Sequence, residues 1–320
     1  MKQTKLDRAC VIAIKDCMGA KKNESVLIVT DEFKNKIGYA LFENAKKLGH
    51  ESVYLEFKSR EMHGQEPPKQ VAEMMKLFDV VLCPTAKSLT HTNARREASA
   101  LGARIATFPG ITEEIMIRGL NADYKKIAAL TIKLQEIMNE VNIVRVTAPN
   151  GTDITMDISG RKALPSKGLF HKKGESGNLP TGEAYIAPLE GKSNGVFVVD
   201  GSMSGVGVID KKPITIQVEN GFATKISGGV QAKKLDSILN KYGKFARNIA
   251  EFGIGTNDKA KLSGIILEDE KVMGTIHIAL GDNKSMGGNV DVPIHLDGIV
   301  KKPTVYFDGK VIMKNGKLLV

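Results

Sequence analysis

The sequence contains no tryptophan, and aromatic residues make up only 5% of its 320 residues. Single-stranded nucleic acids bind by stacking their bases on aromatic side chains, so few such platforms are available here. The chain is nevertheless basic, with a formal net charge of +10. Its lysines come as scattered pairs rather than as one tract, which favours a solvated basic surface over a nucleic-acid partner.

Cysteine and long apolar runs are also scarce. The three cysteines, Cys10, Cys17 and Cys83, have no short metal-binding spacing, so the pattern argues against a disulfide scaffold and favours the reducing cytoplasm. Each lies in an apolar stretch and is expected to be a small core residue. No run approaches 18 apolar residues and the first residues lack the apolar segment of a signal peptide, so we expect no membrane partner.

The first part of the chain alternates strand and helix patterns. Short apolar runs at residues 25–30, 51–57, 79–83 and 103–108 are separated by helical periodicity. This alternation predicts an α/β domain with an open, mostly parallel sheet over residues 1–141, closed by an amphipathic helix. The first run is not followed by G-x-G-x-x-G, and no P-loop motif occurs, which argues against binding of a dinucleotide or of ATP.

The second part of the chain, residues 142–320, has the pattern of a β-rich α+β domain. Short alternating strands are separated by turn dipeptides, among them Asn150-Gly151, Asp308-Gly309 and Asn315-Gly316. One strong helical pattern interrupts them at residues 235–249. We therefore predict a domain boundary near residue 142.

Five polar residues of this second part stand out. His295 and Asp297 lie two positions apart in an extended segment, so their side chains share one face, where they could bind a metal ion or simply hydrogen-bond to each other. His277 interrupts an apolar strand, although a lone histidine there could be a satisfied core residue. Glu183 precedes an apolar strand and Glu251 directly follows the predicted helix; either could be merely solvated.

Taken together, these two imidazoles and three carboxylates next to glycine-rich turns form a plausible ligand set. Mixed nitrogen and oxygen donors suit Zn²⁺, Co²⁺, Mn²⁺ or Fe²⁺ rather than a thiolate site. Five ligands exceed the needs of one tetrahedral ion. The sequence therefore predicts one or two divalent metal ions in the second domain.

The motifs LPTGEAYIAP, EFGIGTN, HIALG and IHLDG occur in this order between residues 179 and 298. As a set they resemble the aminopeptidase T / aminopeptidase S family of metalloaminopeptidases, often described as leucyl aminopeptidases. The resemblance implies an N-terminal α/β domain, a C-terminal metal-binding catalytic domain and a homodimer. It also implies hydrolysis of short peptides at their N-terminal residue by a metal-activated water, with Zn, Co or Mn preferred to Fe. The implied ligands of a two-metal centre are Glu183, Glu251, His277, His295 and Asp297.

The chain departs from the pattern of that family at two positions. The family has a further metal-binding Glu five residues before the His of HIALG, where this chain has Val272. It also has a Tyr seven residues after that His, where this chain has Lys284. A lysine can donate to an oxyanion, so Lys284 is the candidate catalytic residue, with an ordinary loop lysine as the alternative.

Two further functions fit the same residues. The resemblance extends to the 2,5-dihydroxypyridine ring-cleaving dioxygenases, which hold Fe²⁺ through two His and one Asp. His295 and Asp297 match that motif, but the remaining His would fall near Glu251. The second alternative is a relative that binds metal without catalysis. Retention of all five ligand types favours the hydrolase, and bound metal with oxygen consumption would favour the dioxygenase.

Overall fold

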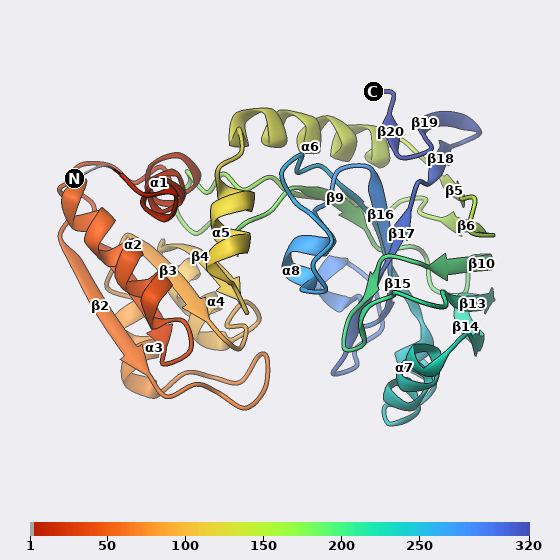
Figure 1. Ribbon diagram of the computed structural model, residues 1–320, viewed down its shortest axis with the longest axis horizontal. Helices are drawn as coiled ribbons and strands as arrows, with labels where there is room; N and C mark the ends of the chain where they lie inside the picture. Colours follow the sequence, from red (N-terminus) through yellow and green to blue (C-terminus); the bar gives the residue numbers. More distant parts are fainter. Residues whose placement is uncertain (1–2) are drawn as a thin grey trace. The chain divides into compact units, whose positions relative to one another are not determined.

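The computed structural model describes residues 3–320, which form two compact units. Unit 1 comprises the residues up to Ala128 together with Gly168–Thr181 (Figure 1). Unit 2 comprises Ala129–Lys167 and Gly182–Val320. The boundary predicted at residue 142 follows helix α6 (Tyr124–Asn139), whereas the compact units divide within this helix. Unit 1 also includes the later segment Gly168–Thr181, and no change in the composition of the sequence predicts this.

Unit 1 is built on a parallel sheet with the strand order β2-β1-β3-β4-β8. Its strands are β1 (Val26–Asp31), β2 (Ser52–Phe57), β3 (Val80–Thr85), β4 (Arg104–Pro109) and β8 (Ser176–Asn178). Its helices are α1 (Lys5–Val11), which continues as the π-helical η1 (Ile12–Cys17), α2 (Asn35–Lys47), α3 (Lys69–Met75), α4 (Asn93–Ala100) and α5 (Glu113–Leu120). The predicted parallel sheet is therefore present in this unit.

The central strands of this sheet have no exposed face. Every residue of β1 and β3 is buried, as expected for parallel strands that are covered on both sides. Cys10, Cys17 and Cys83 are buried and free, which confirms their prediction as core residues. The apolar runs that indicated strands in the sequence are thus explained by burial on two faces.

Unit 2 contains two sheets built from antiparallel pairs. The eight-stranded sheet has the order β14-β13-β10-β6-β5-β18-β19-β20, and the seven-stranded sheet has the order β12-β11-β17-β16-β15-β9-β7. The strands of the first are β5 (Ile143–Thr147), β6 (Asp153–Asp157), β10 (Ser193–Val199), β13 (Ile214–Glu219), β14 (Phe222–Ser227), β18 (Thr304–Phe307), β19 (Lys310–Lys314) and β20 (Lys317–Leu318). Those of the second are β7 (Leu164–Ser166), β9 (Glu183–Ile186), β11 (Ser202–Met203), β12 (Gly207–Val208), β15 (Ile249–Gly255), β16 (Thr275–Gly281) and β17 (His295–Lys301). Shorter helical elements are α7 (Val230–Asn240), η2 (Lys244–Arg247), α8 (Ile266–Asp269) and η3 (Lys284–Met286).

The apolar core of unit 2 joins residues of both sheets. Phe252 of β15 packs edge-on against Phe307 of β18, with ring centroids 6.4 Å apart. Ile276 and Ile278 of β16 belong to the same buried cluster. Side chains alternate between the two faces along a strand. The residues that alternate with Phe252 on β15 and with Ile276 and Ile278 on β16 must therefore face away from this core. This alternation gives the seven-stranded sheet a second face that is free to carry polar groups.

The predicted turns of this unit are present, but one predicted helix is too long. Asp308-Gly309 and Asn315-Gly316 have positive φ at both residues and join β18 to β19 and β19 to β20. The helix predicted over residues 235–249 ends at Asn240, and Gly243 follows with a φ of 76°. Ile249 instead begins the buried strand β15. The apolar spacing continued past the helix because a fully buried strand is also apolar.

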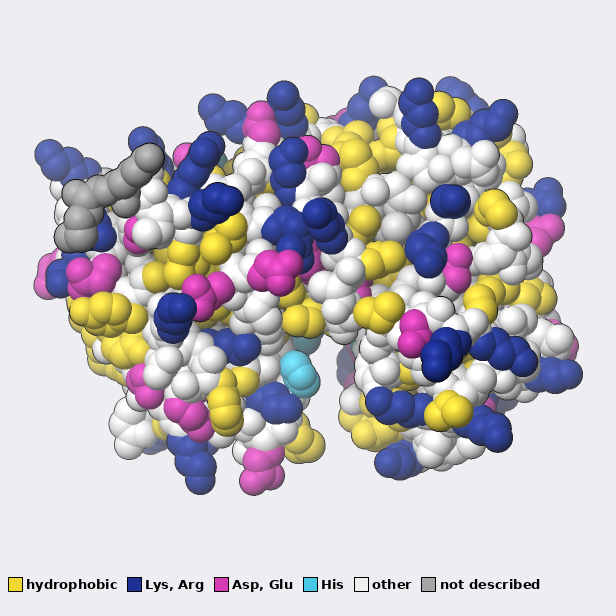
Figure 2. Space-filling view, viewed as in Figure 1, with side chains coloured by type: hydrophobic (Ala, Val, Ile, Leu, Met, Phe, Trp, Pro, Cys, Tyr) yellow, Lys and Arg dark blue, Asp and Glu magenta, His cyan; other side chains and the backbone are white. Residues whose placement is uncertain are grey.

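The surface of the molecule carries many basic side chains. Figure 2 shows Lys and Arg spread over the visible face, with Asp and Glu between them. Within residues 3–320, no helix combines the length and the apolar character that a membrane crossing needs.

Candidate metal centre

The polar face of the seven-stranded sheet collects the predicted ligands from four neighbouring strands. On β15, Glu251 alternates with Phe252 and therefore points away from the apolar core. In the register of the sheet, Glu251 lies opposite Ala279, and Ala279 lies opposite Asp297 of β17. Directly opposed residues share a face, so the whole row of side chains projects from one side of the sheet.

The other predicted ligands lie in adjacent rows of the same face. Glu183 begins β9 and lies opposite Gly255, while His277 lies opposite Gly253. His295 is the first residue of β17 and lies opposite Gly281. Because it is two residues before Asp297, its side chain projects from the same face of the sheet. Five residues that are up to 114 positions apart in the chain are thereby brought to one surface of the sheet.

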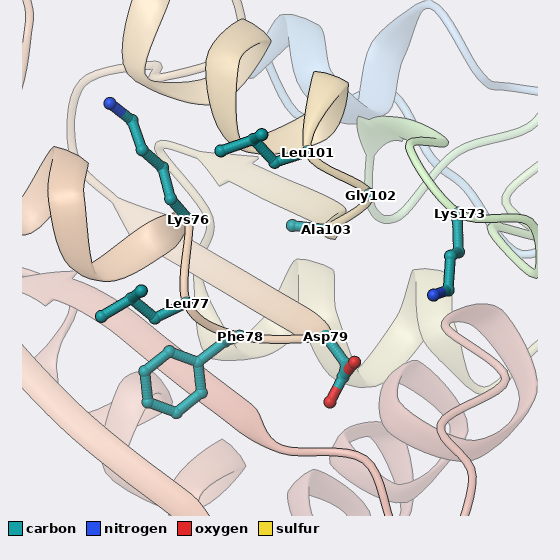
Figure 3. A pocket seen from close by; sticks show the side chains of 8 residues that line it. All are labelled: Lys76, Leu77, Phe78, Asp79, Leu101, Gly102, Ala103 and Lys173. Carbon is teal, nitrogen blue, oxygen red and sulfur yellow. The ribbon is translucent and has the colours of Figure 1, made fainter.

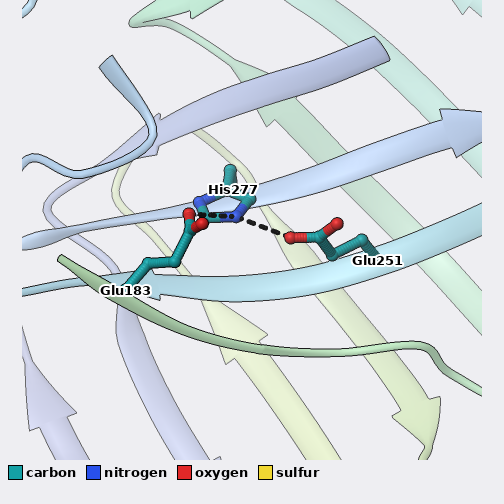
Figure 4. Close-up of side chains that lie close together, drawn as sticks. All are labelled: Glu183, Glu251 and His277. Atoms are coloured by element: carbon teal, nitrogen blue, oxygen red, sulfur yellow. Dashed lines mark hydrogen bonds and ion pairs between the residues drawn. The ribbon is translucent and has the colours of Figure 1, made fainter. Parts of the chain in front are cut away.

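Gly253 makes room for the central histidine. A Cβ at this position would lie 2.0 Å from His277 Nε2, a distance that no side chain could tolerate. The imidazole therefore occupies the space above β15 that a larger residue would fill. Figure 4 shows the result: the His277 ring lies between the carboxylates of Glu183 and Glu251.

Glu251 links the two histidines of the cluster. Its Oε1 lies 3.0 Å from His277 Nε2, and its Oε2 lies 3.1 Å from His295 Nε2. His295 Nε2 is also 3.3 Å from Asp297 Oδ1. These contacts place two carboxylates beside His295 Nε2, so that one cation could be shared by all three side chains.

Two sets of side chains satisfy the geometry of a metal site. Glu251, His295 and Asp297 each offer one ligand atom, and these atoms lie within 4.8 Å of one another. Glu183, Glu251 and His277 form a second such set. Oxygen and imidazole nitrogen are the donors that Fe²⁺, Mn²⁺ and Zn²⁺ accept, so the residues fit a divalent ion.

A further observation points to an ion rather than to a closed hydrogen-bond network. Among the residues described, buried Glu183 Oε2 and His277 Nδ1 have no hydrogen-bond partner. Buried polar atoms are normally paired, because leaving one unpaired costs about 1–3 kcal/mol. The cluster therefore retains binding capacity that its own side chains do not use.

Burial and charge shift the protonation of the cluster in opposite directions. Burial lowers the pKa of His277, but the hydrogen bond to Glu251 and the nearby carboxylates outweigh it and raise the pKa to about 9. Burial disfavours the charged form of Glu251, yet its hydrogen bonds with His277 and His295 hold its pKa below the usual range. In the absence of a metal, protons on the imidazoles supply the positive charge that balances these acids.

Supporting contacts fix the orientation of the ligand side chains. His295 Nδ1 lies 2.7 Å from the backbone carbonyl of Asp282, an arrangement that leaves Nε2 directed at the acids. Ser204 Oγ accepts a hydrogen bond from the backbone N–H of Asp297 at 3.1 Å. Such outer contacts hold metal ligands in place in metalloproteins.

Lys271 and Glu270 join the cluster although neither was predicted. Lys271 Nζ donates to Glu183 Oε1 at 2.5 Å and also pairs with Glu270. Both residues follow the short helix α8, and the Lys271 side chain is only 2% exposed. Burial raises the pKa of Glu270 to about 8, against the opposing effect of Lys271. The sequence offered no signal for the burial of Lys271, because residues 268–271 are four successive charged residues and are typical of a solvated segment.

Val272 and Lys284, the two departures from the peptidase pattern, lie in different surroundings: Val272 is close to the cluster and Lys284 is exposed. Val272 pairs through its backbone with Asn257, and the neighbouring Glu270 supplies a carboxylate close to this position. Lys284 lies on η3 with its side chain 65% exposed, where it pairs with Asp291. The structure therefore does not bring Lys284 into the cluster, because its loop is held by Glu190, which accepts hydrogen bonds from Asn283 and Asn289.

A hollow in unit 1 does not involve these residues. It has a volume of about 130 Å³ and lies where β3 and β4 begin, with Asp79 and Lys173 in its wall (Figure 3). Ligands of parallel sheets bind at the carboxyl ends of the strands, and this hollow lies at the opposite ends. The cluster on the seven-stranded sheet is the stronger candidate for the functional site.

Comparisons with known proteins identify the family of this chain. The sequence model of the 2,5-dihydroxypyridine 5,6-dioxygenase (NicX) family matches residues 6–320, so the chain belongs to this family. The 2,5-dihydroxypyridine 5,6-dioxygenase of Pseudomonas putida KT2440 is 23% identical over 250 residues, which cover 72% of this chain and 69% of that protein.

Two solved structures share the fold. The 2,5-dihydroxypyridine dioxygenase of Pseudomonas putida KT2440 superposes with a TM-score of 0.85 at 18% identity, covering 100% of this chain and 98% of that one. Wild-type AmpT from Thermus thermophilus superposes with a TM-score of 0.72 at 17% identity, covering 99% of each chain. The relation to aminopeptidase T is thus one of fold.

The prediction of a metalloaminopeptidase is wrong, as are the hydrolase and protease assignments that went with it. The family match over residues 6–320 and the curated relative both point to a dioxygenase, which is an oxidoreductase. The motifs that suggested a peptidase shape a sheet that both groups of proteins share. Strand and turn residues that build a common scaffold do not by themselves specify the reaction.

Proposed function

We propose that this chain is an iron-dependent dioxygenase that cleaves the ring of a small dihydroxylated nitrogen heterocycle, of the dihydroxypyridine class. The observation that carries the proposal is the set of Glu251, His295 and Asp297, whose ligand atoms lie within 4.8 Å of one another. Membership of the 2,5-dihydroxypyridine 5,6-dioxygenase family supports the same reaction class.

In this proposal the three residues hold one Fe²⁺. The resemblance implies two His and one Asp, and here Glu251 replaces one of the two imidazoles. A set of one imidazole and two carboxylates is still suited to Fe²⁺ or Mn²⁺, which favour oxygen ligands. Bound Fe²⁺ supplies the one-electron chemistry that lets O₂ react with an aromatic ring.

The protein's own groups orient the ligands and control access. His277 holds one oxygen of Glu251, and the Asp282 carbonyl fixes the ring of His295. The His295 side chain is 30% exposed, whereas those of Glu251 and Asp297 are 8% and 7% exposed. A small flat substrate therefore reaches the centre from the side of His295.

Two side chains on the same face are suited to a hydroxylated ring. Tyr185 lies opposite Gly253 and offers an aromatic surface beside the cluster. Burial, together with the Glu251 and Glu183 carboxylates, raises the pKa of Tyr185, so its hydroxyl remains a donor. Glu183 Oε2 has no hydrogen-bond partner among the described residues and only a 3.5 Å contact with His277 Nε2, so it can accept a proton from a substrate hydroxyl.

The protein is first loaded with Fe²⁺ under anaerobic conditions. The test is then its consumption of oxygen when O₂ and the substrate are added. We expect 2,5-dihydroxypyridine to be consumed in proportion to O₂ and with opening of the ring, measured with an oxygen electrode and by absorbance. His295→Gln is expected to abolish turnover, while the exposed variant Glu51→Gln is expected to retain it. An iron-loaded protein that consumes no O₂ with this compound or its positional isomers would refute the proposal.

The assembly and partners of the chain stay predictions from the sequence. We predict that the chain forms a homodimer and that it binds neither nucleic acid nor a membrane. We also predict that it is located in the cytoplasm. Light scattering on the purified protein measures the first of these.

A further inference from the structure

The two candidate ligand sets share Glu251 but differ in the charge next to them. The set of Glu251, His295 and Asp297 has no lysine or arginine bonded to its side chains in the ion pairs of residues 3–320. The other set includes Glu183, whose Oε1 is bonded to Lys271 Nζ at 2.5 Å. One set is therefore open to a cation, and the other already contains one.

The Lys271 ammonium is held firmly in this position. Its side chain is 2% exposed and pairs with both Glu183 and Glu270. The backbone is also fixed: Lys271 N–H donates to the Glu268 carbonyl at 3.0 Å, and the Lys271 carbonyl accepts from Asn257 N–H at 2.9 Å. Moving the ammonium away would leave two buried carboxylates without their common partner.

A metal ion in the second set would compete with this ammonium. It would have to use Glu183, Glu251 and His277, and ligand oxygens lie about 2 Å from such an ion. The ammonium on the other oxygen of Glu183 would then lie close to a divalent charge of the same sign. Glu270, the remaining nearby carboxylate, is already bonded to Lys271.

We propose that Lys271 takes the place of a second metal ion, so that the centre binds a single divalent ion at Glu251, His295 and Asp297. The proposal rests on the single-ion centre of the proposed function and adds the residue that excludes a second ion. Lys271 is in this view a positioning residue: it holds Glu183 and Glu270 by charge and keeps the second set closed to metal.

The test is the number of ions bound per chain, measured by equilibrium dialysis with Mn²⁺ followed by elemental analysis. The full-length protein is expected to bind about one ion, and Lys271→Met, which removes the charge at similar length, about two. Lys271→Arg keeps the charge and is the matched control, expected to remain at one. Spin coupling between two Mn²⁺ ions in the electron paramagnetic resonance spectrum of Lys271→Met provides a readout that a merely structural lysine would not change.

A second variant covers the case that Lys271→Met does not fold. The double variant Lys271→Met/Glu270→Gln removes the lysine and one of its partners together, which leaves fewer unpaired buried charges. It retains Glu183, Glu251 and His277 and is also expected to bind two ions. Two ions in the unmodified protein, or folded variants without the lysine that bind no more ions than the unmodified protein, would overturn the proposal.

Failure of the proposed function gives a different result. If the unmodified protein binds no ion and Lys271→Met binds one, the role of Lys271 is supported while the iron centre is refuted. Adding His295→Ala to Lys271→Met locates the ions, since it is expected to remove one of the two and leave the ion near Glu183.

Discussion

Two buried carboxylates, Asp31 in unit 1 and Glu251 in unit 2, show how differently one chain uses the same chemical group. Asp31 ends β1 and is 1% exposed. Its oxygens accept hydrogen bonds from the backbone N–H groups of Phe33, Lys34 and Ala86 and from the Ser59 hydroxyl. Its partners are mostly amides, which have no other charge state and cannot move away.

Glu251 is surrounded by side chains instead. Its two oxygens contact the imidazoles of His277 and His295, each of which can give up a proton and change its role. A carboxylate fixed by amides stabilises the fold, whereas one held by exchangeable imidazoles can bind a cation in their place. The environment of the acid, rather than its burial, distinguishes the structural from the functional residue.

The largest expected effect is on metal binding by Glu251, the functional residue of this comparison. Glu251→Ala removes the ligand shared by both sets, and metal affinity is expected to fall by about 1,000-fold or more, with loss of oxygenase activity. Isothermal titration with Mn²⁺ and Fe²⁺ measures the change. Asp31→Ala is the control and is expected to leave the metal affinity unaltered; equal loss in both variants would contradict the distinction between them.

The same variant, Asp31→Ala, tests the structural role of the Asp31 carboxylate. Asp31→Ala removes an acceptor from four donors and leaves two of them, the backbone N–H groups of Phe33 and Ala86, without any other, so we expect it to lower the free energy of unfolding by about 2 kcal/mol. Urea denaturation of the metal-free protein measures this change. The exposed Glu51→Ala is expected to change the free energy by less than about 0.5 kcal/mol. An Asp31→Ala protein as stable as Glu51→Ala would show that these hydrogen bonds contribute nothing net.

The difference between the two units also explains what the sequence could predict. Local patterns identified β1, β16 and the hairpins after Phe307 and Lys314, because apolar runs and Asn-Gly or Asp-Gly turns are encoded within a few residues. The shared face of His295 and Asp297 followed from strand periodicity alone. Their meeting with Glu183 and His277 depends on the order of strands in the sheet, which the sequence indicated only through a family resemblance.

The remaining errors have a common cause. Lys271 was missed because nothing in a charged segment shows that its side chain turns inward, and its burial depends on Glu183, which lies on a strand far away in sequence. Lys284 was selected by position relative to His277, although its loop extends to the surface. The reaction was misassigned because the motifs encode a sheet whose fold dioxygenase and aminopeptidase relatives share, and a shared fold does not specify the reaction.

The smallest expected effect concerns an acid of unit 1 that is only partly buried. Asp7 forms a capping box with Thr4, with Thr4 N–H and Asp7 N–H each 3.0 Å from the partner's side-chain oxygen, and it accepts from Asn44 at 2.8 Å. The Thr4 hydroxyl, then Asn44, hold the pKa of Asp7 near 2, below its value in the unfolded chain. Its ionised form therefore stabilises the fold above about pH 4, and this contribution is lost as the pH falls from about 4 to about 2.

Asp7→Asn should accordingly lower the free energy of unfolding at pH 7 by about 0.5–1 kcal/mol, because it weakens the cap and the interaction with the helix N-terminus. The difference from the unmodified protein should shrink as the pH is lowered through 3, since both side chains are then uncharged for a growing fraction of molecules. Thermal denaturation at pH 7, 4 and 3 measures the trend. A difference that stayed constant over this range would show that Asp7 acts through packing rather than through its charge.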